Sequence, residues 1–248
     1  METMEPAGEK PIVIARGGAS AEAPEHTIAA FETALTEGAD ALALRVRASK
    51  DGQPVVFGDP TLERTTDGRG PVAQQTVREL KRLDAGGWKG ARFRGQRIQT
   101  LQEVLERFRD RTRFWIELPD DANAQSGIEE RVVSTLEIYE AVETCLVQSA
   151  DPEALGRVRA LNPAIPLGAL WSAGPLHAAL PASGTADALC PAVELLRAAD
   201  VEKIRAAGLG CYVWTVNEPD LADRLVGWRV DGILTDRPGL VRARVGRV

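Results

Sequence analysis

The stretch from residue 38 to residue 46 reads GADALALRV and has the pattern of one strand of a barrel. Side chains alternate between the two faces of a strand, so Arg45 shares a face with Ala43 and Arg47, while the opposite face carries only Leu and Val. In a barrel, a wholly aliphatic strand face packs against the surrounding helices. We therefore predict that Arg45 points into the mouth of a barrel.

Other apolar runs share this rhythm and are separated by longer amphipathic stretches. The predicted strands are Ile12–Ala15, Ala41–Val46, Phe114–Leu118, Cys145–Ser149, Pro166–Leu170, Ala188–Pro191, Cys211–Thr215 and Gly232–Thr235. Helices are predicted at about Thr27–Glu37, Leu101–Arg109, Ile128–Ala141, Pro152–Leu161, Ala198–Ala207 and Pro219–Gly227, with a weak helical pattern at Ala173–Leu180. This alternation predicts an α/β fold with a parallel sheet, most economically a closed (β/α)8 TIM barrel. An open doubly wound sheet is the alternative, but no GxGxxG motif follows the first strand.

The length of 248 residues suits one such barrel, which we predict to run from residue 11 to residue 248 as a single domain. Residues 59–97 are rich in Gly, Arg, Asp and Thr, show little periodicity and are too many for an ordinary loop. They predict a small insertion after the second strand. The first ten residues are polar, and we expect them to be poorly ordered and neither a signal peptide nor a membrane span.

The composition is that of an ordinary globular protein, with 44% hydrophobic and 27% charged residues. A net charge of −6 argues against a general binder of nucleic acid or of anionic membranes, but allows a small anionic ligand in a local positive pocket. Cys145, Cys190 and Cys211 lie in apolar runs and are expected to be buried thiols. We predict a cytoplasmic protein; no pattern in the sequence indicates its oligomeric state.

Several motifs recur in a fixed order along almost the whole chain. They are VIARG (13–17), PEHT (24–27), GADALALRV (38–46), DGQPVVFGD (51–59), PTLERTTDGRG (60–70), IQTLQEVL (98–105), YVWTVNEPD (212–220) and VDGILTDRPG (231–239). Together they resemble the glycerophosphodiester phosphodiesterase family, whose pattern is roughly HRG, PENT, GAD-x-x-E-x-D-V, DG-x-P-V-V-x-HD, L-x-RTTDG, E-x-K and WTVN. The resemblance implies a TIM barrel with its site at the carboxyl ends of the strands.

The resemblance also implies a mechanism in which two histidines act as acid and base. A Ca²⁺ or Mg²⁺ ion, held by two carboxylates of the second strand and one of the third, offsets phosphate charge. The residues at these positions are Ala15 and Gly58 for the histidines, Ala43, Arg45 and Glu117 for the metal ligands, and Pro119 for a lysine. We therefore expect no catalytic residue of the family type, no metal and no other cofactor.

The chain has two histidines. His26 lies in PEHT, where the family has asparagine, so it is expected near the mouth. It is either a substitute acid or base, or a polar residue at a helix start that takes over the hydrogen bonds of asparagine; we favour the second reading because a general acid must reach the leaving oxygen. His177 is expected on the surface.

Six residues are candidate ligand-binding residues at the mouth: Arg16, Glu25, Arg45, Asp59, Glu117 and Trp214. The resemblance places Arg16 beside the phosphate and implies that Glu25 pairs near it. Arg45 is predicted to pair with Glu117 in place of the metal, either as part of a ligand site or merely to neutralise the remaining acid. Trp214 either lines the pocket or belongs to the core.

Three functions follow. The favoured one is an inactive or impaired relative of the phosphodiesterases that keeps a pocket for a phosphorylated or other anionic ligand. The second is an active phosphoric diester hydrolase of glycerophospholipid metabolism with a rewired, metal-free site. The third is a structural or partner-binding barrel with a vestigial pocket.

Overall fold

The computed structural model describes residues 10–119 and 127–246. The expectation of a poorly ordered N-terminus therefore lies outside the described residues except at Lys10.

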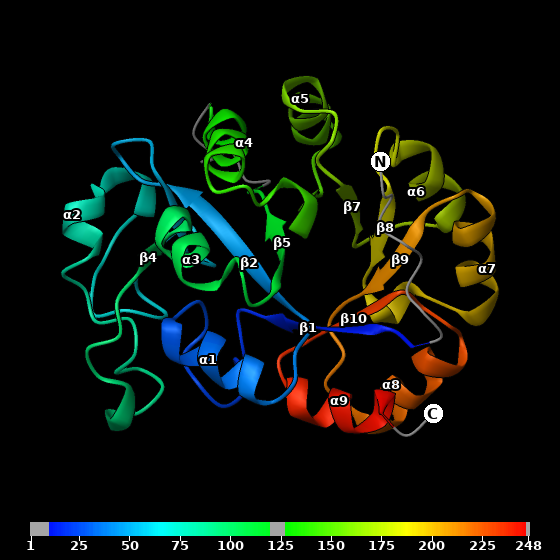
Figure 1. Ribbon diagram of the computed structural model, residues 1–248, viewed down its shortest axis with the longest axis horizontal. Coiled ribbons are helices and arrows are strands. Elements are labelled where there is room, and N and C mark those ends of the chain that lie inside the picture. The colour runs from blue at the N-terminus through cyan, green and yellow to red at the C-terminus, as the bar shows by residue number, and fades with distance from the viewer. Residues whose placement is uncertain (1–9, 120–126, 247–248) are drawn as a thin grey trace.

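Eight parallel strands form a closed barrel, which confirms the predicted TIM barrel (Figure 1). In barrel order they are β1 (Ile12–Arg16), β2 (Ala41–Ala48), β5 (Arg113–Glu117), β6 (Cys145–Ser149), β7 (Leu167–Trp171), β8 (Ala188–Pro191), β9 (Gly210–Val213) and β10 (Gly232–Thr235). The barrel closes because β1 pairs with both β2 and β10. Pairing of β2 with β5 sets Arg45 opposite Glu117.

Helices surround the barrel: α1 (Ile28–Thr36), α3 (Leu101–Phe108), α4 (Ile128–Ile138), α5 (Pro152–Leu161), α6 (Leu176–Ala182), α7 (Ala198–Ala206), α8 (Pro219–Gly227) and α9 (Pro238–Val245). All the predicted helices are present, including the weakly patterned α6, which carries the exposed His177. Helix α9 was not predicted from the sequence; it is short, and its second residue is Gly239. No helix within the described residues is long and apolar enough to span a bilayer.

Side-chain caps begin several of these helices. Thr27 accepts a hydrogen bond from the Ala30 amide, and Thr100 forms a capping box with Glu103. Asn217 does not cap α8, because the cap position is Glu218 and the Asn217 side chain donates to Asp236.

Two apolar layers stabilise the barrel. The larger one lies between the strands and the helices and includes Leu42, Leu44 and Val46, as the alternation in β2 predicts. The smaller one fills the barrel interior, where Trp115 meets Tyr212 edge to face with ring centroids 5.2 Å apart. Removal of these side chains from water is the main favourable term in folding.

The three cysteines are buried and free, as predicted. Burial raises the pKa of Cys145 and of Cys211 to about 12, so these thiols stay protonated.

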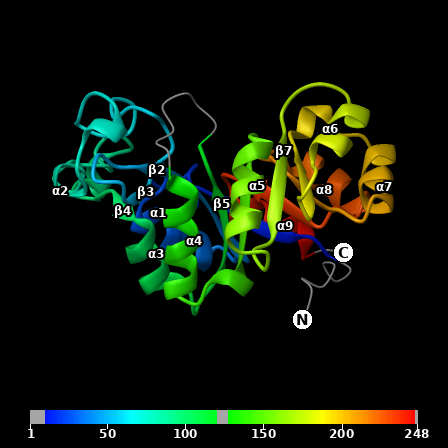
Figure 2. The ribbon, with the colours of Figure 1, turned by 90° about the horizontal axis from the view of Figure 1, so that it is seen from above.

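The unit that follows β2 runs from residue 54 to residue 100, so the insertion extends beyond the predicted bounds of 59 and 97 and carries regular structure that its sequence did not indicate. Strand β3 (Pro54–Val56) pairs antiparallel with the end of β2 and with β4 (Gln99–Thr100), and helix α2 (Val77–Leu80) lies between β3 and β4 in the chain. The insertion has its own small core, formed by Val55, Phe57, Leu62, Val72, Leu80, Ala85 and Ile98. Seen from above, this unit stands to one side of the barrel, next to β2 and α3 (Figure 2).

Candidate functional site

A cavity of about 230 Å³ opens at the carboxyl ends of the barrel strands. Its lining residues come from both the barrel and the insertion: Arg16, Gly17, Ser20, Glu25, His26, Ala43, Leu44, Arg45, Gly58, Asp59, Arg64, Glu117, Gln148, Leu170, Trp214 and Leu234. All six candidate ligand-binding residues are among them. The strand ends bring these residues together because parallel barrel strands all finish at the same rim.

Arg45 and Glu117 form the predicted ion pair across neighbouring strands. The Nε atom of Arg45 lies 2.6 Å from Oε1 of Glu117. Gln148, which the sequence analysis missed, donates its amide to the other carboxylate oxygen at 3.4 Å. The two charged side chains are 39% and 21% exposed, so solvent screens the pair and it contributes about 1 kcal/mol or less to stability.

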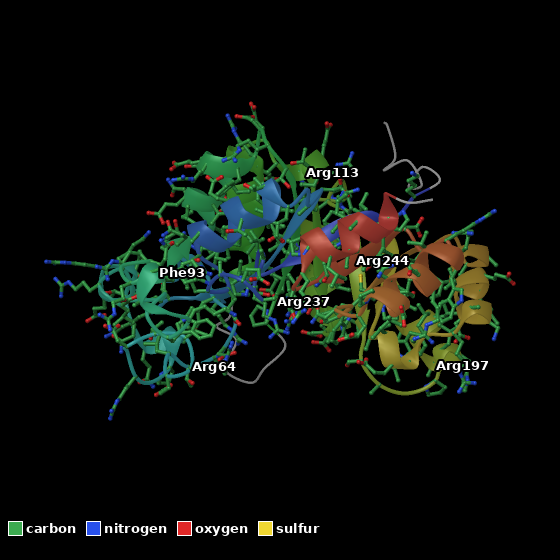
Figure 3. The ribbon with its side chains drawn as sticks, turned by 90° about the horizontal axis from the view of Figure 1, so that it is seen from below. Arg64, Phe93, Arg113, Arg197, Arg237 and Arg244 are labelled. Atoms are coloured by element: carbon green, nitrogen blue, oxygen red, sulfur yellow. The ribbon has the colours of Figure 1, made fainter. Side chains whose placement is uncertain are left out.

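Arg64 of the insertion binds two acids at the rim. It donates to both oxygens of Glu25 at 3.0 and 2.7 Å and to Asp59 at 2.8 Å. Burial alone would raise the pKa of Glu25, but the hydrogen bonds from Arg64 and nearby positive charge outweigh it and lower that pKa. Figure 3 labels Arg64 on the insertion.

Arg16 lines the cavity and pairs with Asp236. Its Nη1 lies 3.3 Å from Asp236, while Glu25 takes Arg64 as its partner. Asp236 also accepts hydrogen bonds from Ser20 at 2.9 Å and Asn217 at 2.8 Å. The position of Asp236 just after the last barrel strand is a signal that could have marked it as a site residue.

Trp214 has both of the roles considered for it, because it lines the cavity and also packs against the apolar layer inside the barrel. Its ring lines the cavity, and its indole N–H donates to the Cys190 carbonyl oxygen at 2.8 Å. The hydrogen bond holds the ring against the barrel wall.

His26 is a buried part of the cavity wall and is only 8% exposed. Its backbone has φ 60°, a conformation that Asn, Asp and His adopt more readily than most residues, which explains why asparagine and histidine both suit this position. Its Nδ1 has no hydrogen-bond partner within the described part of the chain. That His26 takes over the hydrogen bonds of asparagine stays a prediction.

The imidazole instead lies beside Gly58. A Cβ atom added to Gly58 would be 3.5 Å from Nε2 and Cδ2 of His26 and 3.0 Å from Oε1 of Glu25. A side chain at position 58 and the His26 ring would therefore compete for the same space.

Burial holds the pKa of His26 at about 4, because the charges of Arg16, Arg45 and Arg64 add to desolvation and exceed the attraction of Glu25. The pKa of His26 is about 4 in the folded protein and the usual 6.5 in the unfolded chain. As the pH falls below 6.5, the unfolded chain therefore binds a proton that the folded protein does not, and the folded protein becomes less stable. Between pH 7 and pH 5 we expect stability to fall by about 1–2 kcal/mol from this group. Urea unfolding at both pH values measures it.

His26→Asn should remove most of that pH dependence, whereas the matched change at the exposed His177, His177→Asn, should retain it. An equal pH dependence in the wild type and the His26→Asn variant would contradict the assignment.

Comparison with known proteins identifies the family. Residues 17–240 match the model of the Glycerophosphoryl diester phosphodiesterase family. The chain belongs to this family. A glycerophosphodiester phosphodiesterase of Caldanaerobacter subterraneus is 37% identical over 233 residues, covering 92% of this chain and 95% of the relative. A putative glycerophosphodiester phosphodiesterase of Bacillus subtilis, YhdW, is 36% identical, with 92% and 96% covered.

Solved structures agree on the fold. A phosphodiesterase of Oleispira antarctica, in complex with the product sn-glycerol-3-phosphate, has a TM-score of 0.82 and 30% identity, covering 96% of this chain and 97% of that one. A putative glycerophosphoryl diester phosphodiesterase of Silicibacter pomeroyi has a TM-score of 0.85 and 25% identity, with 96% and 94% covered.

The positions at which the glycerophosphodiester phosphodiesterase motifs have catalytic residues differ in their surroundings. Gly58 and Ala43 line the cavity. Ala15 is fully buried in the apolar layer between strands and helices, and it and Pro119 are not among the lining residues. Among the positions that the resemblance assigns to catalytic or metal-binding residues, Glu117 has the assigned residue and lines the mouth.

Proposed function

We propose that this glycerophosphodiester phosphodiesterase family protein binds a small phosphorylated or other anionic ligand at the barrel mouth without cleaving it by histidine-and-metal chemistry. The observation that carries the proposal is the contact of Arg45 with Glu117, which places a fixed cation on the one carboxylate remaining at the family's metal-ligand positions.

The lack of a proton donor supports this proposal. Proton transfer in the transition state needs a group that titrates near neutrality. Neither Ala15 nor Gly58 has such a group, and His26, with a pKa of about 4, is neutral at physiological pH. A neutral imidazole can donate a hydrogen bond, but it holds no extra proton to give to a leaving alkoxide.

The residues at the mouth do not fit a divalent ion. Calcium takes six to eight oxygen ligands and magnesium requires near-octahedral oxygen geometry. Only Glu117 has a carboxylate among the three ligand positions that the resemblance assigns, and Arg45 already occupies it. Within residues 10–119 and 127–246, no three His, Cys, Asp or Glu side chains cluster in a way suited to a metal.

The open cavity supports ligand binding rather than a vestigial pocket. It is lined by Arg16, Arg45 and Arg64, and guanidinium groups bind phosphate oxygens with directed, charge-assisted hydrogen bonds. The Oleispira structure holds sn-glycerol-3-phosphate, so a phosphorylated ligand is the chemistry that a relative of this fold takes.

Glycerol 3-phosphate should bind in the presence of EDTA, which titration calorimetry measures. Arg16→Met and Arg45→Met should each weaken binding about tenfold or more, because each removes charge-assisted hydrogen bonds. Arg224→Met, at an exposed position on α8, is the matched control and should bind as the wild type does. Absence of saturable binding, or equal loss in all three variants, would contradict a ligand site at the mouth.

Ca²⁺, Mg²⁺ and Mn²⁺ should cause no saturable rise in the melting temperature, because Arg45 repels a second cation beside Glu117. A thermal-shift titration with each ion measures this. A rise that saturates and is abolished by Glu117→Gln would show that the mouth binds metal.

An active, metal-free hydrolase is the second candidate. Two observations favour it: several relatives are named as phosphodiesterases, and the His26 ring lies beside the position of the family's second histidine. Direct assay separates this function from the first.

A further inference from the structure

The insertion carries a compact loop, residues 84–97, which we call the Trp88 loop. Its base is closed by a hydrogen bond from the Ala85 amide to the Gln96 carbonyl oxygen at 2.8 Å. The Asp84 carboxylate accepts from the amides of Gly86, Gly87 and Gly95 at 2.8, 2.9 and 3.1 Å. The loop therefore has a defined shape, and it lies at the outer end of the insertion (Figure 1).

Cations and aromatic rings gather on this loop, whose one acid, Asp84, is occupied by backbone amides at its base. From residue 85 to residue 102 the sequence contains Lys89, Arg92, Arg94 and Arg97 but no Asp or Glu. Within the described chain, none of these four forms a salt bridge, and Trp88 is 40% exposed. Lys89 lies 5.6 Å from the Trp88 ring centroid and Arg92 lies 4.6 Å from that of Phe93.

The loop belongs to a basic part of an acidic protein. Residues 59–97 contain nine Lys and Arg against five Asp and Glu, a charge of +4, so the rest of a chain of −6 carries −10. The net charge of −6 argued against binding to anionic membranes, but it does not reveal that the positive charge is concentrated in residues 59–97.

We propose that the Trp88 loop docks the protein on an anionic phospholipid surface. Basic residues are attracted to anionic leaflets, and tryptophan is enriched at the boundary between headgroups and acyl chains. A flat lipid surface can contact the protruding loop without contacting the rest of the protein. The acidic residues elsewhere then lie more than about 8–10 Å from the lipid, and salt screens their repulsion. An extended polyanion such as duplex DNA would also face the acidic remainder of the protein.

Docking here would bring the cavity entrance close to the lipid surface. Lys89 donates to the Ser20 carbonyl oxygen at 2.7 Å and Arg92 to that of Glu22 at 3.2 Å. Ser20 lines the cavity, so the loop is fixed directly to the rim. This inference does not depend on whether the cavity binds or cleaves its ligand.

Co-sedimentation with vesicles tests the proposal. The wild type should bind vesicles that contain phosphatidylglycerol in phosphatidylcholine, should not bind phosphatidylcholine alone, and should dissociate as NaCl is raised. Each basic residue near an anionic surface is worth about a fivefold change in affinity, so K89Q/R92Q/R94Q should bind about 100-fold more weakly. Trp88→Ala should give a smaller loss that salt does not change.

The matched control is R131Q/R197Q/R224Q, which removes the same charge at exposed positions outside the insertion. Arg197 lies at the opposite end of the molecule from Phe93 (Figure 3). Should the triple loop variant unfold, Arg94→Gln alone, which breaks no hydrogen bond in the described structure, should still lose about fivefold. Absence of binding to anionic vesicles, equal loss in both triple variants, or loop-dependent binding to duplex DNA without vesicle binding would overturn the proposal.

Discussion

Purified protein is expected to leave glycerophosphocholine and glycerophosphoethanolamine intact, with or without Ca²⁺ or Mg²⁺. General acid–base catalysis contributes about 10²–10⁴-fold for each positioned group, so the lack of two such groups predicts a rate at least about 10⁴-fold below that of a family member that has both. Product release followed by a coupled assay of glycerol 3-phosphate measures the rate.

The glycerophosphodiester phosphodiesterase of Caldanaerobacter subterraneus, assayed in parallel, is the positive control. A metal-stimulated turnover of about 1 s⁻¹, ordinary for an enzyme, would refute the proposal of a non-catalytic mouth. A metal-independent turnover that is lost in His26→Asn would instead establish the active, rewired hydrolase.

Restoring the family residues is expected to create phosphodiesterase activity, but only when position 26 is changed as well. The substitutions are A15H, A43E, R45D, G58H and P119K, with H26N as the sixth. The fivefold variant crowds a new imidazole at position 58 against the His26 ring, which lies 3.5 Å from the Cβ position there. We therefore expect the sixfold variant to exceed the fivefold variant by about tenfold or more, since a small misplacement of a catalytic group can cost about 10²-fold.

Activity of the sixfold variant should require added Ca²⁺ or Mg²⁺, because R45D replaces a cation with a carboxylate beside Glu117. H26N alone is the control and should remain inactive. Equal activity of the fivefold and sixfold variants would disprove the competition for space. If both stay inactive while folded, either the imidazole at the buried position 15 does not reach the mouth, or the insertion or the cavity shape has also diverged.

The sequence predicted the barrel and the inward direction of Arg45 because both depend on short-range patterns. Alternation along β2 decides which face of the sheet each side chain occupies, and it does so whatever the register between β2 and its neighbouring strands. The pairing of Arg45 with Glu117 was predictable for a related reason: both lie at the ends of strands that the family resemblance places next to each other. The site residues at strand ends were foreseeable because parallel strands finish at one rim.

Secondary structure inside the insertion was not predictable in this way. Strand β3 has three residues and β4 has two, and segments this short show no periodicity from which to infer them. They form because they pair with the extended end of β2 and cover a small apolar core.

The sequence by itself determined the fold, the buried thiols and the charged residues that line the mouth, except Arg64. Apart from the pair of Arg45 with Glu117, only the tertiary structure decided which charges pair. Arg64 pairs with Glu25, 39 residues away, and Arg16 pairs with Asp236, 220 residues away. The sequence contains other acids of suitable charge for each of these arginines. The choice depends on where the loops and the insertion cross the mouth, and so does the position of His26 against Gly58. Ion pairing and steric exclusion act over a few ångströms, and distances of that kind between remote segments exist only once the barrel has closed.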